Sequence, residues 1–500
     1  MAPENRPHLL IKTNMDSPTP SMPRLPDDAT GLRSGTLSSG FITLLVISAA
    51  SPLSVVAGGF PIGMMLGNGA GTPALVVLAL LLLLMFAAGY TAMGTCVTSA
   101  GGFYAMISRG VGGAAGGAAA FIAILGSLTL QFGLYGLLGE VVSESLRTQF
   151  DLSVPWWLVA VAAIASVAYF GFHQIDFSAK ILACFVVAEY AFVLLLDVLI
   201  LHRGGAHGIE FSSFQPAALS AGNPSIGILF CFAAFIGFEA TTIYSEEAKD
   251  PKRSIPIATY SALILVGCFY SFSLWCLVIG TGAERVQETI TGLSDPTNFL
   301  YLLSDTYAGQ PLTLLLRGMF IVSIYAGLIA FHNSTARYFY SMGRERLLPR
   351  RLGCTHPQYK SPHVASLLQT VLCLAVVLLF ALFKADPVLH LFSWLSNIAT
   401  VCLLLLMMAT AVAVIVFFRR DAHAYSRFRI FWMPLAALLG LSFVFALAVP
   451  NFQVLTGASQ ALSWALLALL PCAGLAGWAA ALRLKALDPV AYATLGHDRK

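Results

Sequence analysis

Three carboxyl groups stand inside long apolar stretches of this 500-residue sequence: Glu189, Asp197 and Glu239. An ionised carboxylate is costly among hydrophobic side chains, so such a group must face polar protein groups or water, or carry a proton. It can then bind a cation, receive the amine of a ligand, or take up and release a proton. These three positions therefore favour ligand and ion binding as the chemistry of this chain.

Glu189 stands near the centre of an apolar run at about 177–201. Burial disfavours the charged form of its carboxyl group, so the side chain could accept and release a proton. Two other interpretations stay open: a neutral glutamate hydrogen-bonded between helices, and a sodium ligand, because carboxylates suit hard cations. Asp197 lies near the outer end of the same run, and we expect it to reach water.

Glu239 follows Gly237 inside another apolar run, at about 224–245. A glycine beside a charged residue in such a run predicts an unwound turn over Ile236, Gly237 and Phe238 next to a polar cavity. A buried glutamate paired within the bundle is the alternative.

A second interruption is expected in the first apolar run, where Ala49, Ala50 and Ser51 precede Pro52. Proline lacks the backbone N–H and clashes with the preceding turn, so either a break or an ordinary kink results. The two interruptions fall in the first and sixth runs, the spacing of an inverted five-plus-five repeat. Helix amino termini at such breaks would direct N–H groups at an anion such as a carboxylate.

The elements that must position these groups are membrane helices. Hydrophobic residues make up 58% of the chain, charged residues 10%, and the mean hydropathy is +0.80. Soluble proteins carry about 25% charged residues, so this chain must be solvated by lipid. Backbone groups in lipid must be satisfied within each segment, which predicts an all-α integral membrane protein. Twelve runs are long enough to span a bilayer, at about 40–67, 73–98, 113–142, 155–172, 177–201, 224–245, 255–280, 311–341, 362–383, 387–418, 430–449 and 459–482.

The distribution of basic residues predicts the orientation. With the amino terminus in the cytoplasm, 23 of the 28 Lys and Arg residues fall on the cytoplasmic side. We therefore expect a multi-pass protein of the cell membrane with both termini cytoplasmic. The predicted organisation is a disordered tail at about 1–34, a twelve-helix domain at about 35–482 and a second tail at about 483–500. Within the domain we expect repeat one at about 40–201, repeat two at about 224–418 and two further helices at about 430–482.

Several chemistries are not expected. The sequence has no P-loop motif for ATP and no H-E-x-x-H or G-x-S-x-G motif, so we predict no enzyme activity and no cofactor. The nine cysteines form no C-x-x-C pair, which argues against a metal site. A net charge of +4 is too small to indicate nucleic acid as a partner. The run of small residues from Gly110 to Phe121 predicts close helix packing in lipid.

Four stretches of the sequence resemble the amino acid–polyamine–organocation family of permeases. They are the interrupted first run, SAGGFYAMISRGVGG at 99–113, FIGFEATTIYSEEAKDPKRSIPIA at 235–258 and NSTARYFYSMGRERLLP at 333–349. The resemblance implies ten core helices in two inverted repeats plus two peripheral helices. It also implies a secondary transporter of an amino acid that works by alternating access and is coupled to protons, sodium being less favoured. A polyamine or other organic-cation importer and an amino acid exchanger are the alternatives.

The resemblance also implies which residues form the substrate site. The substrate carboxylate and amine would be held by backbone near Ala49, Ala50 and Ser51 and near Ala234, Phe235, Ile236 and Gly237. Ala49-Ala50-Ser51-Pro52 replaces the glycine-rich turn common in the family. Glu239 matches a proton-responsive glutamate of one family member, and Ala233 stands where that member has a gating tryptophan. A short alignment that starts at Lys180 puts Glu189 at the position of a coupling lysine.

Two further sets of polar residues are candidates. Glu246, Glu247 and their charged neighbours follow the sixth run, either as a solvated loop or as an inner gate that pairs with Arg33, Arg337 or Arg344. Other polar residues within the spans line a cavity or, more commonly, bond helices together: Gln131, Tyr135, Tyr325, His332, Asn333, Trp394, Ser396 and Asn397.

Overall fold

The computed structural model describes residues 35–173, 176–293, 295–420 and 425–496. Within these ranges every regular element is a helix, apart from one isolated bridge between Leu37 and Ala248. Ten helical segments are long and apolar enough to cross a membrane, and two shorter apolar helices accompany them, Trp156–Phe172 and Pro224–Ala233. The all-helical membrane architecture is therefore as expected. The tail predicted at 1–34 lies outside the described residues, as does the side chain of Lys180.

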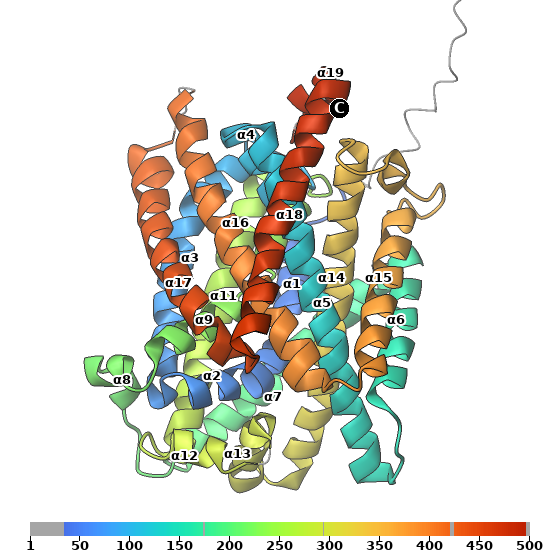
Figure 1. Ribbon diagram of the computed structural model, residues 1–500. Helices are drawn as coiled ribbons and strands as arrows, with labels where there is room; N and C mark the ends of the chain where they lie inside the picture. The colour runs from blue at the N-terminus through green and yellow to red at the C-terminus, as the bar shows by residue number, and fades with distance from the viewer. Residues whose placement is uncertain (1–34, 174–175, 294, 421–424, 497–500) are drawn as a thin grey trace, which may run out of the picture.

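The helices form a single upright bundle (Figure 1). The helices that make up the body of the bundle are α1 (Ser39–Ala50) with α2 (Phe60–Leu66), α3 (Thr72–Gly94), α5 (Gly113–Phe150), α6 (Trp156–His173), α7 (Asp176–His202), α9 (Pro224–Ala233) with α10 (Ala240–Ile243), α11 (Pro251–Thr281), α14 (Gln310–Arg344), α15 (His363–Leu382), α16 (Ser393–Arg420), α17 (Met433–Thr456) and α18 (Gln460–Leu487).

Short helices mark the two ends of this bundle. The helices α4 (Phe103–Gly110) and α19 (Pro489–Ala493) lie at one end, here called the α4 end. The opposite end, here called the α12 end, carries α8 (Pro216–Ser220), α12 (Val286–Thr291) and α13 (Phe299–Tyr307). The first span starts at the α4 end and the sixth starts at the α12 end, so the two run antiparallel.

The first span is interrupted where the sequence places Ser51 and Pro52. Helix α1 ends at Ala50, and Ser51 takes a left-handed conformation with φ 44°. Proline at the next position cannot continue the α-helical bonding, so the chain changes direction here. It then continues as a π-helical turn over Ser54–Gly59 and as α2.

The sixth span is interrupted around Gly237. Helix α9 ends at Ala233, and α10 begins only at Ala240. Between them the backbone bonds connect residues three apart, as from Phe238 N–H to the carbonyl of Phe235. Gly237 has φ +112°, a conformation that side-chain-bearing residues rarely adopt. This glycine therefore permits a backbone conformation inside the interruption that other residues would resist.

Small residues bring α5 and α18 together. A Cβ atom on Gly117 would lie 2.6 Å from both the Cβ of Ala481 and the carbonyl oxygen of Gly477. This contact falls in the small-residue run from Gly110 to Phe121, and close helix packing there is confirmed.

The end of the chain differs from the expected tail. Helix α18 continues to Leu487, five residues past the predicted boundary at 482. The next residues fold back onto the α4 end, where Asp488 pairs with Arg346 and the N–H of Gly496 donates to Glu345 Oε1 at 3.3 Å. Leu484 and Leu495 are both buried, so apolar contacts extend the ordered region.

Candidate functional site

The two helix breaks touch each other at the centre of the bundle. A Cβ atom on Gly237 would lie 2.9 Å from the Cβ of Ala49, 3.3 Å from its carbonyl carbon and 3.4 Å from the nitrogen of Ala50. The backbone of the sixth span can approach the first this closely only because residue 237 has no side chain. The predicted residues of both breaks are thus brought together.

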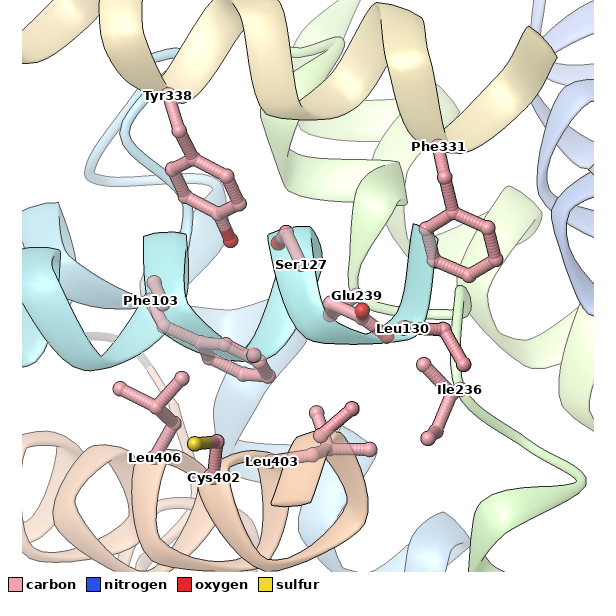
Figure 2. A pocket seen from close by; sticks show the side chains of 13 residues that line it. Phe103, Ser127, Leu130, Ile236, Glu239, Phe331, Tyr338, Cys402, Leu403 and Leu406 are labelled. Atoms are coloured by element: carbon pink, nitrogen blue, oxygen red, sulfur yellow. The ribbon is translucent and has the colours of Figure 1, made fainter. Parts of the chain in front are cut away.

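A small cavity opens beside the sixth break (Figure 2). Its volume is about 20 Å³, which is room for about one water molecule. Ile236 and Glu239 line it from the break, and the other walls come from α4, α5, α14 and α16. The lining side chains labelled in Figure 2 include Phe103, Ser127, Leu130, Phe331, Tyr338, Cys402, Leu403 and Leu406. An amino acid is far larger than this space, so its binding would require the walls to separate.

Glu239 joins the cavity to the backbone of the break. Its Oε2 accepts a 2.8 Å hydrogen bond from the N–H of Gly237. Its own carbonyl oxygen accepts a 2.9 Å bond from the hydroxyl of Tyr90 on α3. The carboxyl group therefore stabilises the turn at Gly237 while it also faces the cavity, so a change at Glu239 can alter both.

Glu189 lies against the first break. Its Oε2 accepts a 2.8 Å bond from the hydroxyl of Ser323 on α14 and a 3.4 Å bond from the N–H of Leu53. Ser323 Oγ also accepts from the N–H of Ser54 at 3.3 Å. Glu189 is only 1% exposed, and its Oε1 has no hydrogen-bond partner among the described residues. One carboxyl group thus connects three spans at the point where the first one bends.

Asp197 does not reach water, contrary to the sequence-based expectation. Its side chain is fully buried between α7 and α11, where Oδ2 accepts a 2.6 Å bond from the hydroxyl of Ser273. Helix α7 continues to His202, so the position lies more than one turn inside the end of the helix.

Only some of the predicted site residues line the cavity. Within the described structure Ile236 and Glu239 line it, whereas Ala49, Ala50, Ser51, Ala234, Phe235 and Gly237 form the packed contact behind it. Sequence reasoning missed Phe103, Phe331 and Tyr338. Two of them could have been found from the sequence, because Phe103 and Tyr338 lie in stretches that resemble the permease family, at 99–113 and 333–349.

Most of the other polar candidates bond helices together. Tyr325 donates to Ser166 Oγ at 2.8 Å, Trp394 Nε1 donates to the carbonyl of Thr456 at 3.0 Å, and Asn397 Nδ2 donates to the carbonyl of Leu455 at 3.2 Å. His332 lies 2.7 Å from Ser366 Oγ and, with Gln131, forms a buried polar cluster. These contacts connect α5, α6, α14 and α15 with one another and α16 with α17.

Two arginine–glutamate pairs close the α4 end of the bundle. Arg337 binds Glu247 through two bonds, of 2.7 and 3.2 Å, and Arg344 Nη1 binds Glu246 Oε2 at 3.0 Å. Glu246 Oε1 also accepts from the N–H of Ala100, in the segment before α4. Arg33, the third predicted partner, lies outside the described residues. The pairs connect the end of the sixth span to α14.

Different bonds close the α12 end. The carbonyl of Gly67, just after α2, accepts from the N–H of Asn223 at 2.8 Å and from Gln287 Nε2 at 3.3 Å. Asn68 Nδ2 donates to the carbonyl of Ala218 at 3.0 Å. Separate sets of contacts therefore connect the helices at the two ends of the bundle.

Known proteins were compared with this chain. A family model described as amino acid permease matches residues 39–476. The low-affinity putrescine importer PlaP of Escherichia coli strain K12 is 23% identical over 314 residues, which cover 61% of this chain and 66% of that protein. The amino-acid permease GAP5 of Candida albicans is 25% identical over 342 residues, covering 65% and 52%.

A methylthioribose transporter of Bacillus subtilis is also similar, 24% identical over 270 residues that cover 53% of each protein. The chain thus matches between about half and two thirds of the length of these three relatives. The family and these relatives are transporters and not enzymes.

Proposed function

The chain belongs to the amino acid permease family, and on that basis we propose that it is a secondary transporter that carries an amino acid across the cell membrane by alternating access, driven by protons. The observation that carries the proposal is the contact between the two helix breaks at Gly237 and Ala49. Broken helices expose backbone groups at the midplane of a membrane, where an intact helix would offer a substrate nothing to bind.

The ten long spans and the two shorter apolar helices support a count of twelve. In this proposal the first five form one repeat and the next five its inverted copy, with α17 and α18 peripheral. The antiparallel course of the two broken spans agrees with such a repeat. In this proposal the α4 end faces the cytoplasm with both termini, which the distribution of basic residues among the loops supports.

Alternating access requires that the two ends open in turn. The Arg337–Glu247 and Arg344–Glu246 pairs form the inner gate in this proposal, and the bonds to Gly67 form part of the outer one. Because the two sets share no residue, one can break while the other stays closed. The small cavity at Glu239 agrees with a state in which both gates are shut.

Proton coupling is assigned to Glu189. A charge buried in a membrane domain is costly unless it is paired, and no basic side chain forms a salt bridge with this carboxyl group in the described part of the chain. Its bonds to Leu53 and Ser323 bring it against the first break, so protonation can change how that break packs on α14. Sodium is the less favoured ion.

One observation favours a second candidate, import of a polyamine or other organic amine. The cavity at the sixth break contains a carboxyl group, Glu239, with the rings of Phe103, Phe331 and Tyr338 around it, and no lysine or arginine lines it. A carboxylate and aromatic faces are groups that attract an ammonium ion. An amino acid exchanger is a further form of the same mechanism.

The test is uptake into proteoliposomes of a labelled panel of amino acids and amines, with and without proton or sodium gradients. We expect one amino acid class to accumulate when the outside is more acidic than the lumen, and a sodium gradient to have no effect. Binding without uptake of any compound would instead indicate a binding protein or sensor built on this fold.

A further inference from the structure

Asp197 has no role in the mechanism described so far, although its surroundings are unusual. It is 0% exposed, lies inside the membrane-spanning part of α7, and has one hydrogen bond, from Ser273 of α11 to Oδ2. Its other oxygen, Oδ1, has no hydrogen-bond partner among the described residues. A buried carboxyl group with an oxygen left unbonded is kept at a cost to stability, which calls for a function.

The ionisable groups around Asp197 do not neutralise it. Cys276 on α11 is a titratable side chain that interacts electrostatically with it. Tyr307 of α13 lies farther toward the α12 end, with its hydroxyl on the carbonyl of Gly280, and Arg203 binds the carbonyl of Thr306. Leu53, after the break in the first span, and Ser323 of α14 contact Glu189 instead. Among the described residues no salt bridge involves Asp197.

Asp197 lies on the same helix as Glu189. The two residues are eight apart on α7, about 12 Å along the helix axis, with Asp197 nearer the α12 end. Tyr190 follows Glu189 on the same helix, and its ring lies 4.2 Å from that of Phe269 on α11. The hydroxyl of Tyr190 is buried and has no hydrogen-bond partner among the described residues.

We propose that Asp197, held by Ser273, is a second proton-binding site that takes protons from the α12 side and supplies them to Glu189. This inference rests on the proposed function, since it assigns the outer side to the α12 end and coupling to Glu189. In each cycle a proton from the outside adds to the Asp197 carboxylate and later leaves it toward Glu189. The carboxylate is thereby regenerated, and no other group is consumed.

The experiment measures initial uptake by the full chain in proteoliposomes while only the external pH is varied, from about 8 to about 5, with the internal pH fixed. In Asp197→Asn the external acid stimulation should fall about tenfold or more, because asparagine keeps the shape and still accepts from Ser273 but cannot bind the proton. Substrate exchange without a pH gradient should stay within about twofold of the unmodified protein. A pH-sensitive dye in the lumen should report slower proton entry.

Two controls separate the outcomes. Ser271→Ala removes another buried hydroxyl of α11, which bonds to the carbonyl of Pro73, and should leave the external pH profile unchanged. If Asp197→Asn also keeps that profile, or loses exchange as fully as net uptake, the proposal for Asp197 is overturned. If Glu189→Gln keeps its coupling while Asp197→Asn loses it, the supply of protons from Asp197 to Glu189 is overturned together with the assignment of coupling to Glu189.

Discussion

The carboxyl group of Glu189 accepts a 2.8 Å hydrogen bond from Ser323, a residue 134 positions away on α14. The same serine oxygen accepts from the N–H of Ser54, and Glu189 accepts from that of Leu53. The packing of the first break against α14 therefore depends on the hydrogen-bonding capacity of one carboxyl group. A carboxylate can only accept, whereas its protonated form can also donate.

We expect Glu189→Gln to uncouple transport from the proton gradient. Glutamine keeps an oxygen that can accept from Ser323 and Leu53, but it cannot release a proton. Uptake should then vary by less than about twofold between about pH 5 and about pH 8, and substrate binding should persist. The measurement is uptake against pH in proteoliposomes, beside a binding assay in detergent.

Ser323→Ala is the matched control for this prediction. It removes the hydrogen bond to Glu189 and leaves the carboxyl group in place, so transport should remain dependent on pH. An unchanged pH profile in Glu189→Gln would sink the assignment of proton coupling to this residue.

Gly237 should tolerate no side chain. Alanine at φ +112° is strained by about 1–3 kcal/mol, and its Cβ would lie 2.9 Å from that of Ala49. We expect Gly237→Ala to weaken substrate binding about tenfold, which corresponds to about 1.4 kcal/mol, and Gly237→Leu to abolish it while membrane insertion is unaffected. Binding is measured with labelled substrate, and insertion by the yield of monodisperse protein.

Gly59 supplies the control. It lies in the first span with an ordinary φ of −72°, and a Cβ atom there would meet nothing within 4 Å. Gly59→Ala should leave binding within about twofold. Normal transport by Gly237→Leu would reject the sixth break as part of the site.

The helices and their breaks could be predicted from the sequence, whereas the packing partners could not. Apolar runs long enough for a bilayer fix the spans, and Pro52 and Gly237 carry their own backbone restrictions. Helices in lipid are apolar on every face, so no pattern reveals which side of α7 meets α14. The contact between Glu189 and Ser323 was therefore not foreseeable. The prediction that Asp197 reaches water was wrong for the same reason. Its partner Ser273 lies on α11, and nothing in the sequence around Asp197 reveals that contact.

Arg337 and Glu247 form a buried pair, at 6% and 3% exposure. Removing one partner leaves the other charge buried alone, which costs about 3–5 kcal/mol. Arg337→Ala should therefore open the α4 end and expose the cavity. The reporter is Cys402, which lines that cavity and is otherwise fully buried. In a variant that retains only this cysteine, its reaction with a maleimide applied from the α4 side should accelerate about tenfold or more.

Two comparisons test whether this effect is specific to the gate. Cys373 on α15 is equally buried but does not line the cavity, so its reaction rate should not change. Arg147→Ala breaks an exposed pair with Glu144 near the end of α5 and should have no measurable effect. Equal acceleration at Cys373 and Cys402 would mean that Arg337→Ala loosens the whole bundle instead of opening the inner gate.

A substitution at Glu239, in the ring-lined cavity, tests which of the two proposed substrate classes the protein binds. Glutamine at this position can still accept from the N–H of Gly237, so the break should persist, while the negative charge is lost. We expect Glu239→Gln to weaken competition by diamines about tenfold or more and competition by neutral amino acids by less than about threefold, because only an ammonium group interacts strongly with the carboxylate. Competition against a labelled substrate in binding assays measures both. If both classes lose affinity equally, Glu239 acts by shaping the turn at Gly237 and does not contact the substrate.

Tyr338→Phe, which keeps the ring and removes the hydroxyl, should leave the preference between the classes unchanged, because attraction of an ammonium ion to a ring depends on its face.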